Sequence, residues 1–316
     1  MSRFLISRLG SVIPVMFGVS VVVFLLMQLA PGDVATALLG PQATVAAKEA
    51  LRHALGLDRP LPVQYGVWLT HAVRGDFGVS IATQEPVMDL VLPRFLNTLV
   101  LTFSSLLLAI LIGYPVGIFA ALRSQTVFDR GAMAVTLLLG STPPYWLGLL
   151  LVLLFALRLH WLPVSGMYDI AGNGGLGDLL RHLILPAITT ALGPAAIITR
   201  MVRASVRDAL SRPHVRVARA KGLPRRRLLR RHVLRNALPP VITITGLQLG
   251  YLVGGALLTE VVFDWPGLGS LLYTSITARD LPVVQATTLL IGLCFVLANI
   301  VVDLINVLLD PRLQEG

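Results

Sequence analysis

The sequence has few charged residues, one cysteine and two lysines. Charged residues make up 13% of its 316 residues, against ~25% in a typical soluble domain, whereas 55% are hydrophobic. The mean hydropathy of +0.78 indicates a protein whose solvent is lipid. A single cysteine, Cys294, excludes an internal disulfide framework and a cysteine-rich metal site, and it lies inside an apolar run.

Catalytic motifs are also missing. No Gly-x-x-x-x-Gly-Lys-Ser/Thr phosphate loop is present, and Lys48 and Lys221 stand in other contexts, so the chain is not expected to be an ATPase. The histidines neither cluster at metal-ligand spacing nor pair with a candidate nucleophile; they are His53, His71, His160, His182, His214 and His232. We therefore expect no catalytic residue, metal site or cofactor in this chain.

Six long windows contain no Asp, Glu, Lys or Arg. Even the shortest, 18 residues long, would cover ~27 Å as a helix, close to the ~30 Å hydrocarbon core of a bilayer. The windows are Leu9 to Gly32, Phe95 to Leu122, Gly131 to Leu157, His182 to Thr199, Asn236 to Thr259, and Leu281 to Val302. They predict an all-α polytopic membrane protein with six transmembrane helices. Pro115, Pro143, Pro144 and Pro186 lie inside windows and predict kinked or broken helices.

The first window has an alternative interpretation as a signal peptide, because Arg3 and Arg8 precede it and Ala35-Thr36-Ala37 offers a small-residue cleavage pattern. A signal-peptide core has about 7 to 15 apolar residues, and this window is longer, which favours a membrane helix.

The distribution of Lys and Arg predicts the orientation. Basic residues precede the first helix, flank the short second connection at Arg123 and Arg130, and fill the segment from Arg200 to Arg235. These three regions lie on one side if the helices alternate, and the positive-inside rule places that side, with both termini, in the cytoplasm.

The connections on the other side differ in character. The 33–94 region has helix-like apolar spacing from Val45, with an end expected near Gly56, and is predicted to be a small extracytoplasmic subdomain between helices 1 and 2. The glycine-rich Arg158 to Arg181 segment is predicted to be an irregular loop. In Glu260 to Asp280, aromatic and apolar residues suit a short helix at the membrane interface.

The Arg200 to Arg235 segment holds thirteen basic residues and one acidic residue, so its net charge of +12 exceeds the +10 of the whole chain. Val215 to Lys221 suits a short helix, Gly222 a left-handed turn, and Pro224 the first position of the next helix. A DNA-binding helix-turn-helix is disfavoured because both ends enter membrane helices. A polybasic segment attracted to anionic lipid and a docking element for a cytoplasmic protein both remain open.

Ordered motifs run along nearly the whole chain. The most specific are His214-Val215-Arg216-Val217-Ala218-Arg219-Ala220-Lys221-Gly222-Leu223 and Arg231 to Pro239. Others are Leu29 to Asp33, Leu55 to Tyr65, Trp161 to Gly166, Phe263 to Gly269 and Ala278 to Gln285. In this order the motifs resemble the first permease subunit of the dipeptide, oligopeptide and nickel ABC importers. The general importer signature begins Glu-Ala-Ala, where this chain has Arg216-Val217-Ala218, so contacts of sugar importers do not transfer residue by residue.

The resemblance implies a single permease domain over 1–316 in the bacterial inner membrane, with a cytoplasmic coupling loop at 200–235. A coupling helix would dock on an ATP-binding subunit through Arg216, Val217, Ala218, Arg219, Ala220, Lys221, Gly222 and Leu223. Implied partners are a second homologous permease, two ATP-binding subunits that carry ATP and Mg, an extracytoplasmic substrate-binding protein and membrane lipids, with no nucleic acid. Candidates for binding-protein docking or an outer gate are Asp264, Trp265, Pro266, Gly267, Arg279 and Asp280.

The fifth window carries Gly246, Gly250 and Gly254 at four-residue spacing, which permits close helix packing. Neighbouring Thr243, Gln248 and Tyr251 are candidates for lining a substrate pathway, although packing alone is an equally open interpretation.

The expected function is therefore the import of di- or oligopeptides, with nickel chelates, glutathione or sugars as alternative substrates. An autonomous secondary transporter or channel is the alternative of another class, and it is disfavoured because no ionisable residue lies in the middle of a window to couple protons or sodium. A polybasic membrane scaffold would explain the charge but not the glycine spacing.

Overall fold

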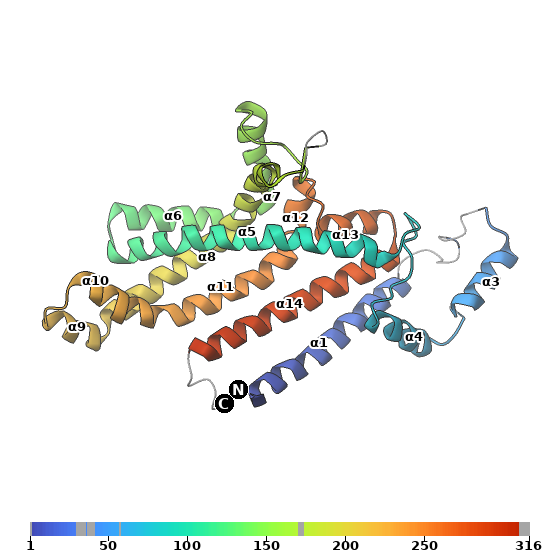
Figure 1. The fold of residues 1–316 in the computed structure, drawn as a ribbon, viewed down its shortest axis with the longest axis horizontal. Helices are drawn as coiled ribbons and strands as arrows, with labels where there is room; N and C mark the ends of the chain where they lie inside the picture. The colour runs from blue at the N-terminus through green and yellow to red at the C-terminus, as the bar shows by residue number, and fades with distance from the viewer. Residues whose placement is uncertain (1, 30–35, 37–41, 57, 170–173, 310–316) are drawn as a thin grey trace.

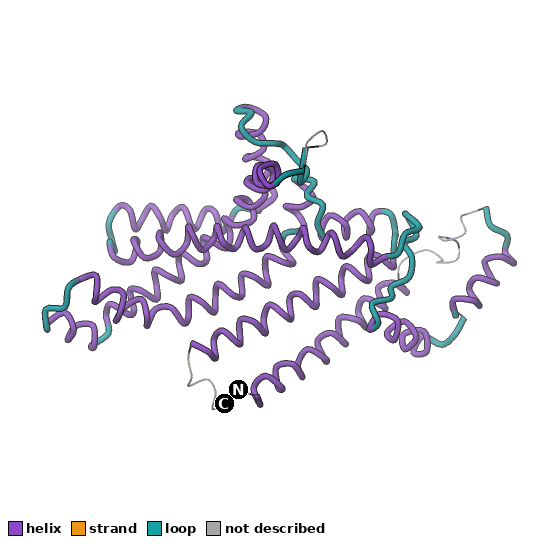
Figure 2. Tube along the Cα trace, viewed as in Figure 1, coloured by secondary structure: helices purple, strands orange, loops and turns teal. Residues whose placement is uncertain are grey.

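The computed structural model describes residues 2–29, 36, 42–56, 58–169 and 174–309. Within this part of the chain the secondary structure is helical, with no strand and one isolated bridge between Val79 and Pro86 (Figure 2). The predicted all-α fold is confirmed. The first motif of the resemblance, Leu29 to Asp33, lies mostly outside the described residues.

Five long helices form the body of the molecule. They are α1 (Ser2–Leu29), α5 (Val87–Leu122), α8 (Leu176–Ser211), α11 (Arg235–Gly255) and α14 (Leu281–Leu309). α8 packs along α5 and α11, α11 packs along α14, and α14 contacts α1. In Figure 1 all five run roughly along the long axis of the molecule.

Small residues explain the close approach of α5 to α8. A Cβ at Gly117 would lie 2.7 Å from the backbone oxygen of Thr199, and one at Gly113 would lie 2.7 Å from the Ile198 side chain. Neither glycine was identified in the sequence as a packing position. Helix association in lipid depends on van der Waals contact. At these two glycines the backbone of α5 lies directly against α8, which a side chain at either position would prevent.

Four helical segments are long and apolar enough to cross a membrane. They are α5, α8, the Arg225–Gly255 segment that ends in α11, and α14 in its Leu281–Ile305 part. A fifth span results if the helical segments Val127–Ser141 and Pro144–Arg158 count as one. The apolar part of α1, Gly10–Leu26, is a shorter helix by the same measure. Six windows therefore correspond to four or five spans by length and composition in the described residues.

The third window is broken, as its prolines predicted. α6 (Val127–Ser141) ends before Pro143, and Pro144 begins α7 (Pro144–Leu151), which continues as the π-helix η1 (Val152–Arg158). The two parts are bent by 104°. Proline at the first position fits a helix start and cannot continue the preceding helix, so the chain turns at this point (Figure 1).

The 33–94 region contains two short helices, α3 (Val45–Leu55) and α4 (Leu61–Val73), before α5 begins at Val87. The predicted helix end at Gly56 is confirmed, because this glycine adopts a left-handed conformation with φ 66° and its N–H bonds the last carbonyls. Nearby, the His71 side chain and the Gly78 N–H bond the Asp76 carboxylate and lower its pKa.

One predicted loop boundary is wrong. α8 begins at Leu176, so only the first part of the Arg158 to Arg181 segment is a loop; the Leu176-Gly177-Asp178 start continues straight into the apolar window. α8 also extends to Ser211, so the first third of the basic segment is helix. Charged residues indicate where a membrane-spanning segment ends, but they do not end the helix. A helix continues into the charged residues as long as its backbone N–H and C=O groups keep their hydrogen bonds.

The remaining helices are short. α9 (Pro213–Ala220), α10 (Arg225–Leu228) and the π-helix η2 (Leu229–Leu234) lead into α11, while α12 (Leu257–Val262) and α13 (Leu268–Thr277) connect α11 to α14. The α5–α6 turn, α9 and α10 lie at one end of the molecule, and α3 and α4 lie at the other (Figure 1). The start of α1 and the end of α14 lie between them.

Candidate functional site

The predicted coupling helix is α9, and it presents one face outward. Arg216, Val217, Arg219, Ala220, Lys221 and Gly222 are exposed, Leu223 is half-buried and Ala218 is buried. Gly222 has φ 76°, the left-handed conformation predicted from the sequence. Pro224 is the residue before α10 rather than its first residue, a shift of one position from the prediction.

Ala218 points into the protein. Its exposed fraction is 7%, and with Val215 it belongs to a core formed by residues of α8, η2 and α11, including Val206, Val233 and Ala237. The small Ala218 side chain thus lets α9 lie close to its own chain. Ala220, in contrast, is exposed and is the small residue available to a partner.

A polar contact ties α9 to α11. The Asn236 side-chain nitrogen lies 3.1 Å from His214 Nε2 and donates to the His232 carbonyl at 2.7 Å. His214 is in the first turn of α9 and Asn236 in the first turn of α11. Together with the buried Val215, this contact makes α9 an extension of the bundle rather than a free loop, so displacement of α9 would be transmitted to α11.

A buried ion pair joins α6 to α8 near the same end. The Arg203 guanidinium donates from Nε and Nη2 to the two Asp129 oxygens, the second bond at 2.7 Å, and Asp129 is 2% exposed. Asp129 also accepts from the Gln125 N–H at 2.8 Å. One turn away, Arg200 donates to the Thr136 carbonyl at 3.1 Å. Two basic residues of the charged segment therefore hold the helix bundle together.

The three pathway candidates do not share one environment. Thr243 is half-buried and donates to the Pro239 carbonyl, and Tyr251 is exposed. Gln248 is buried, and its Oε1 atom has no hydrogen-bond partner. Of the three, Tyr251 is the residue that faces out of this chain.

The three glycines of the same helix also differ. A Cβ at Gly246 would lie 2.3 Å from Val302, and one at Gly250 would lie 3.2 Å from the Phe295 ring, so both face α14 at close range. Around Gly254 nothing lies within 4 Å. The four-residue spacing thus corresponds to a packing contact at two positions, and Gly254 stands at an open surface.

The outer-gate candidates fall into buried and exposed groups. Trp265 and Gly267 are buried, Asp280 is 2% exposed, Pro266 is half-buried, and Asp264 and Arg279 are exposed. The Trp265 indole N–H donates to the Asn97 carbonyl at 3.0 Å, and the Asn97 amide donates to the Pro266 carbonyl at 2.8 Å. The predicted short helix of this segment is α13, on which Tyr273 is exposed, whereas Phe263 and Trp265, which precede it, are buried in the protein core.

Glu260 organises this segment, although the sequence analysis gave it no role. Its carboxylate is fully buried and accepts from the Gly269 and Ser270 N–H groups at 2.7 and 3.1 Å, which are free donors in the first turn of α13. The Thr98 hydroxyl of α5 donates to the other oxygen at 2.7 Å. One side chain therefore links α12, α13 and α5.

Asp280 makes a second such link. It accepts from the Ser80 hydroxyl and from the Ile81 and Ala82 N–H groups at 3.1 and 3.3 Å, which joins the start of α14 to the segment between α4 and α5. The Trp68 indole N–H on α4 donates to Gln285 Oε1 on α14 at 3.0 Å. The predicted extracytoplasmic segment is thus anchored on the final helix.

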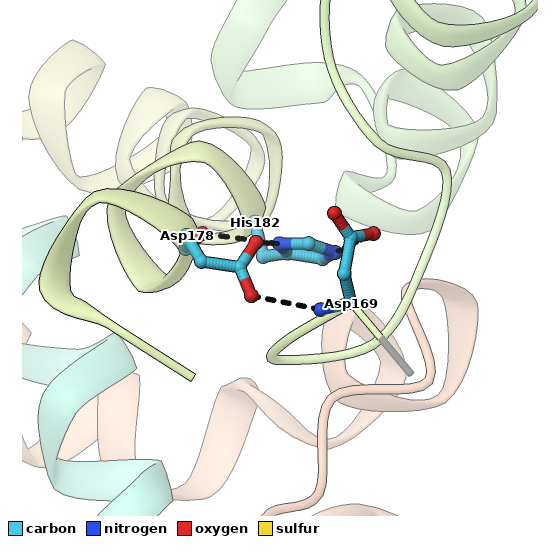
Figure 3. A group of neighbouring side chains, drawn as sticks. All are labelled: Asp169, Asp178 and His182. Atoms are coloured by element: carbon cyan, nitrogen blue, oxygen red, sulfur yellow. Dashed lines mark hydrogen bonds and ion pairs between the residues drawn. The ribbon is translucent and has the colours of Figure 1, made fainter. Parts of the chain in front are cut away.

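A histidine and two aspartates meet beside the start of α8 (Figure 3). His182 Nδ1 lies 3.1 Å from an Asp178 oxygen, Nε2 lies 3.7 Å from an Asp169 oxygen, and the Asp169 N–H donates to Asp178 at 2.9 Å. Their ligand atoms all lie within 4.8 Å of one another. Histidine spacing in the sequence did not reveal this group, because its partners are aspartates and one of them is on a loop. The three residues hold that loop against α8.

An apolar cavity of about 520 Å³ lies between α1, α4, α5 and α14. Its lining includes Met16, Phe77, Met88 and Leu290, and Ser20 is its only polar residue. The Ser20 hydroxyl lies 2.7 Å from the Tyr65 hydroxyl, so it already has a partner. This cavity offers no group that would bind a peptide backbone.

Comparison with protein families identifies the family of this chain. Residues 113–315 match the family described as binding-protein-dependent transport system inner membrane component, and residues 1–102 match its N-terminal counterpart. The chain belongs to this family. It is a permease of an ABC importer, as the motifs predicted, and a multi-pass inner membrane protein.

Full-length relatives and solved structures agree with the family. The glutathione transport system permease protein GsiC of Escherichia coli (strain K12) is 41% identical over 314 residues, 99% of each chain. A putative peptide permease protein of Brucella suis biovar 1 (strain 1330) is 41% identical over 317 residues, again 99% of each. An inward-facing MetNI methionine ABC transporter structure gives a TM-score of 0.57 at 23% identity, covering 72% of this permease and 99% of that chain, which supports the fold.

Proposed function

We propose that this permease imports peptide-like substrates, with glutathione and short peptides as the first candidates. The observation that carries the proposal is the 41% identity, over 99% of both chains, to a glutathione permease and to a putative peptide permease. Nickel chelates and sugars are alternative substrates that no contact in the described residues favours.

The permease would work within an assembly. The proposed partners are a second homologous permease, two ATP-binding subunits that bind ATP and Mg, and an extracytoplasmic binding protein that delivers the substrate. Six spans with both termini in the cytoplasm are supported by the basic residues, which collect on the α5–α6 turn, α9 and α10 at one end of the molecule, as the positive-inside rule expects of the cytoplasmic side (Figure 1).

The proposed docking surface is the exposed face of α9. Arg216, Arg219 and Lys221 supply charge, Val217 supplies an apolar contact with a 54% exposed side chain, and Gly222 closes the helix. The His214 and Asn236 contact and the buried Val215 connect this face to α11. Closure of the ATP-binding subunits would then move α11 directly, and with it the exposed Tyr251.

The proposal is tested by measuring ATP hydrolysis of the complete importer in proteoliposomes with its binding protein and a panel of substrates. Glutathione and dipeptides should stimulate hydrolysis, whereas a nickel chelate or a disaccharide should not. Stimulation by the nickel chelate or the sugar alone would contradict the peptide assignment while leaving the importer assignment intact.

A further inference from the structure

The thirteen basic residues from Arg200 to Arg235 do not form one uniform surface. Arg203 pairs with the buried Asp129, Arg200 bonds a backbone carbonyl, and Arg212 pairs with Asp208 at 2.9 Å. Three others lie on the exposed face of α9, which is the proposed ATPase-docking surface. A separate group of exposed arginines lies on α10 and η2 and consists of Arg225, Arg226, Arg227, Arg230 and Arg231.

These five residues, here called the arginine face, have no acidic partner in the described part of the chain. The nearest acidic residue in the sequence, Asp208, already pairs with Arg212. Five like charges within seven residues repel one another, which lowers stability unless anions compensate them. A surface of this kind therefore favours the binding of anions.

The opposite side of the same helices is fixed in the core. Leu228 is 4% exposed and Val233 is fully buried, and both pack with Val215 and Ala237. The helices are thus amphipathic, and the arginine face keeps one orientation relative to the bundle. It is a formed surface rather than a flexible basic tail.

The position of the arginine face relates it to the bilayer. α10, η2 and α11 follow one another without a loop, and Arg225–Gly255 is one of the segments long and apolar enough to cross a membrane. Arg231 lies four residues before the start of α11 at Arg235. The arginine face therefore lies at the charged end of a candidate membrane span, directly beside its apolar helix.

We propose that the arginine face binds the phosphate groups of anionic phospholipids. A guanidinium group matches phosphate with two parallel N–H bonds, and clusters of four to eight basic residues directly beside a membrane helix are suited to anionic lipid. The surface is continuous with a membrane span, so lipid reaches it without a further partner. This inference rests on the membrane location of the permease and is independent of which substrate is transported.

The test is native mass spectrometry of the assembled importer titrated with phosphatidylglycerol or phosphatidylcholine that carry the same acyl chains. The wild-type complex should bind phosphatidylglycerol at least tenfold more tightly. In R226Q/R227Q/R230Q the preference should fall at least fivefold, since three of the five arginines are removed and each basic residue near the surface contributes up to about a fivefold factor. Raising the ionic strength should weaken the wild-type preference.

Two matched variants make the test specific. R216Q/R219Q/K221Q removes the same charge from α9 and should retain the lipid preference. R226K/R227K/R230K keeps the charge and should retain most of it, which separates headgroup binding from a loss of folding. The proposal is overturned if the wild-type complex does not discriminate between the lipids, or if the α9 variant loses the preference equally. It is also overturned if R226Q/R227Q/R230Q loses its ATP-binding subunits while its lipid preference is unchanged.

Discussion

The Thr98 hydroxyl on α5 donates a 2.7 Å hydrogen bond to the buried Glu260 carboxylate on α12. Thr98 also accepts from the Leu268 N–H at 2.8 Å, so its single proton is directed to Glu260. All three donors around the carboxylate therefore point toward it. The N–H groups of Gly269 and Ser270, in the first turn of α13, find their acceptor on the neighbouring helix α12. This contact fixes α12 and α13 against α5.

Glu260→Gln should lower the stability of the permease by about 1–3 kcal/mol, because the amide group brings N–H donors to a site that already has three donors. Thermal unfolding in detergent measures the effect. Glu49→Gln on the exposed surface of α3 is the matched control and should leave the midpoint unchanged. Equal midpoints for both variants would contradict the capping role.

Removing Arg203 should destabilise the permease more than removing its partner Asp129. Arg203→Gln leaves a carboxylate that is 2% exposed without its charged partner and should cost about 3–5 kcal/mol. Asp129→Asn leaves a guanidinium that is 22% exposed and should cost less. The double variant should be more stable than Arg203→Gln alone, as chemical denaturation of the purified permease would show.

The control for this prediction is Arg212→Gln, which breaks the exposed pair of Arg212 and Asp208 and should change stability by about 1 kcal/mol or less. If Arg203→Gln is no more destabilising than Arg212→Gln, then the buried pair does not anchor α6 to α8.

Ala218 and Ala220 should respond differently to the same substitution. Ala218→Leu forces a large side chain into the core below α9 and should destabilise the permease itself by about 1–3 kcal/mol. Ala220→Leu is exposed and should leave unfolding unchanged, yet reduce co-purification of the ATP-binding subunits and substrate-stimulated ATP hydrolysis. Normal coupling in Ala220→Leu would argue against α9 as the docking surface.

Gly246 and Gly254 provide a matched pair on one helix. Gly246→Ala introduces a methyl group 2.3 Å from Val302 and should destabilise the permease by about 1–3 kcal/mol. Gly254→Ala meets nothing within 4 Å and should be neutral or slightly stabilising, because alanine favours helix. Adding Val302→Ala should restore part of the stability that Gly246→Ala loses. If it does not, the destabilisation does not come from the contact with Val302.

Local sequence signals predicted local structure well. Gly56 and Gly222 mark helix ends in the left-handed conformation, and Pro143 and Pro144 mark the break in the third window. Each of these residues restricts or permits backbone angles by itself, so no tertiary information is needed. The motif around Ala218 identified the family, although it did not show that Ala218 faces inward.

Long-range contacts could not be predicted from the sequence. Thr98 and Glu260 are separated by 162 residues, and neither shows a spacing pattern that signals the other. Trp265 packs with Leu101 and Leu183 and donates to the Asn97 carbonyl, and its sequence context does not reveal these contacts to other helices. Likewise, Arg200 and Arg203 have partners on α6, which a count of charges does not reveal.

Uptake of labelled glutathione into proteoliposomes tests the central claim, that this permease transports peptide-like substrates only when coupled to ATP-binding subunits. The complete importer, with its binding protein outside and ATP accessible to the ATP-binding subunits, should accumulate glutathione, and unlabelled dipeptide or glutathione should compete. The permease chain alone should show no uptake, with or without a proton or sodium gradient. Gradient-driven uptake by the chain alone would contradict the account.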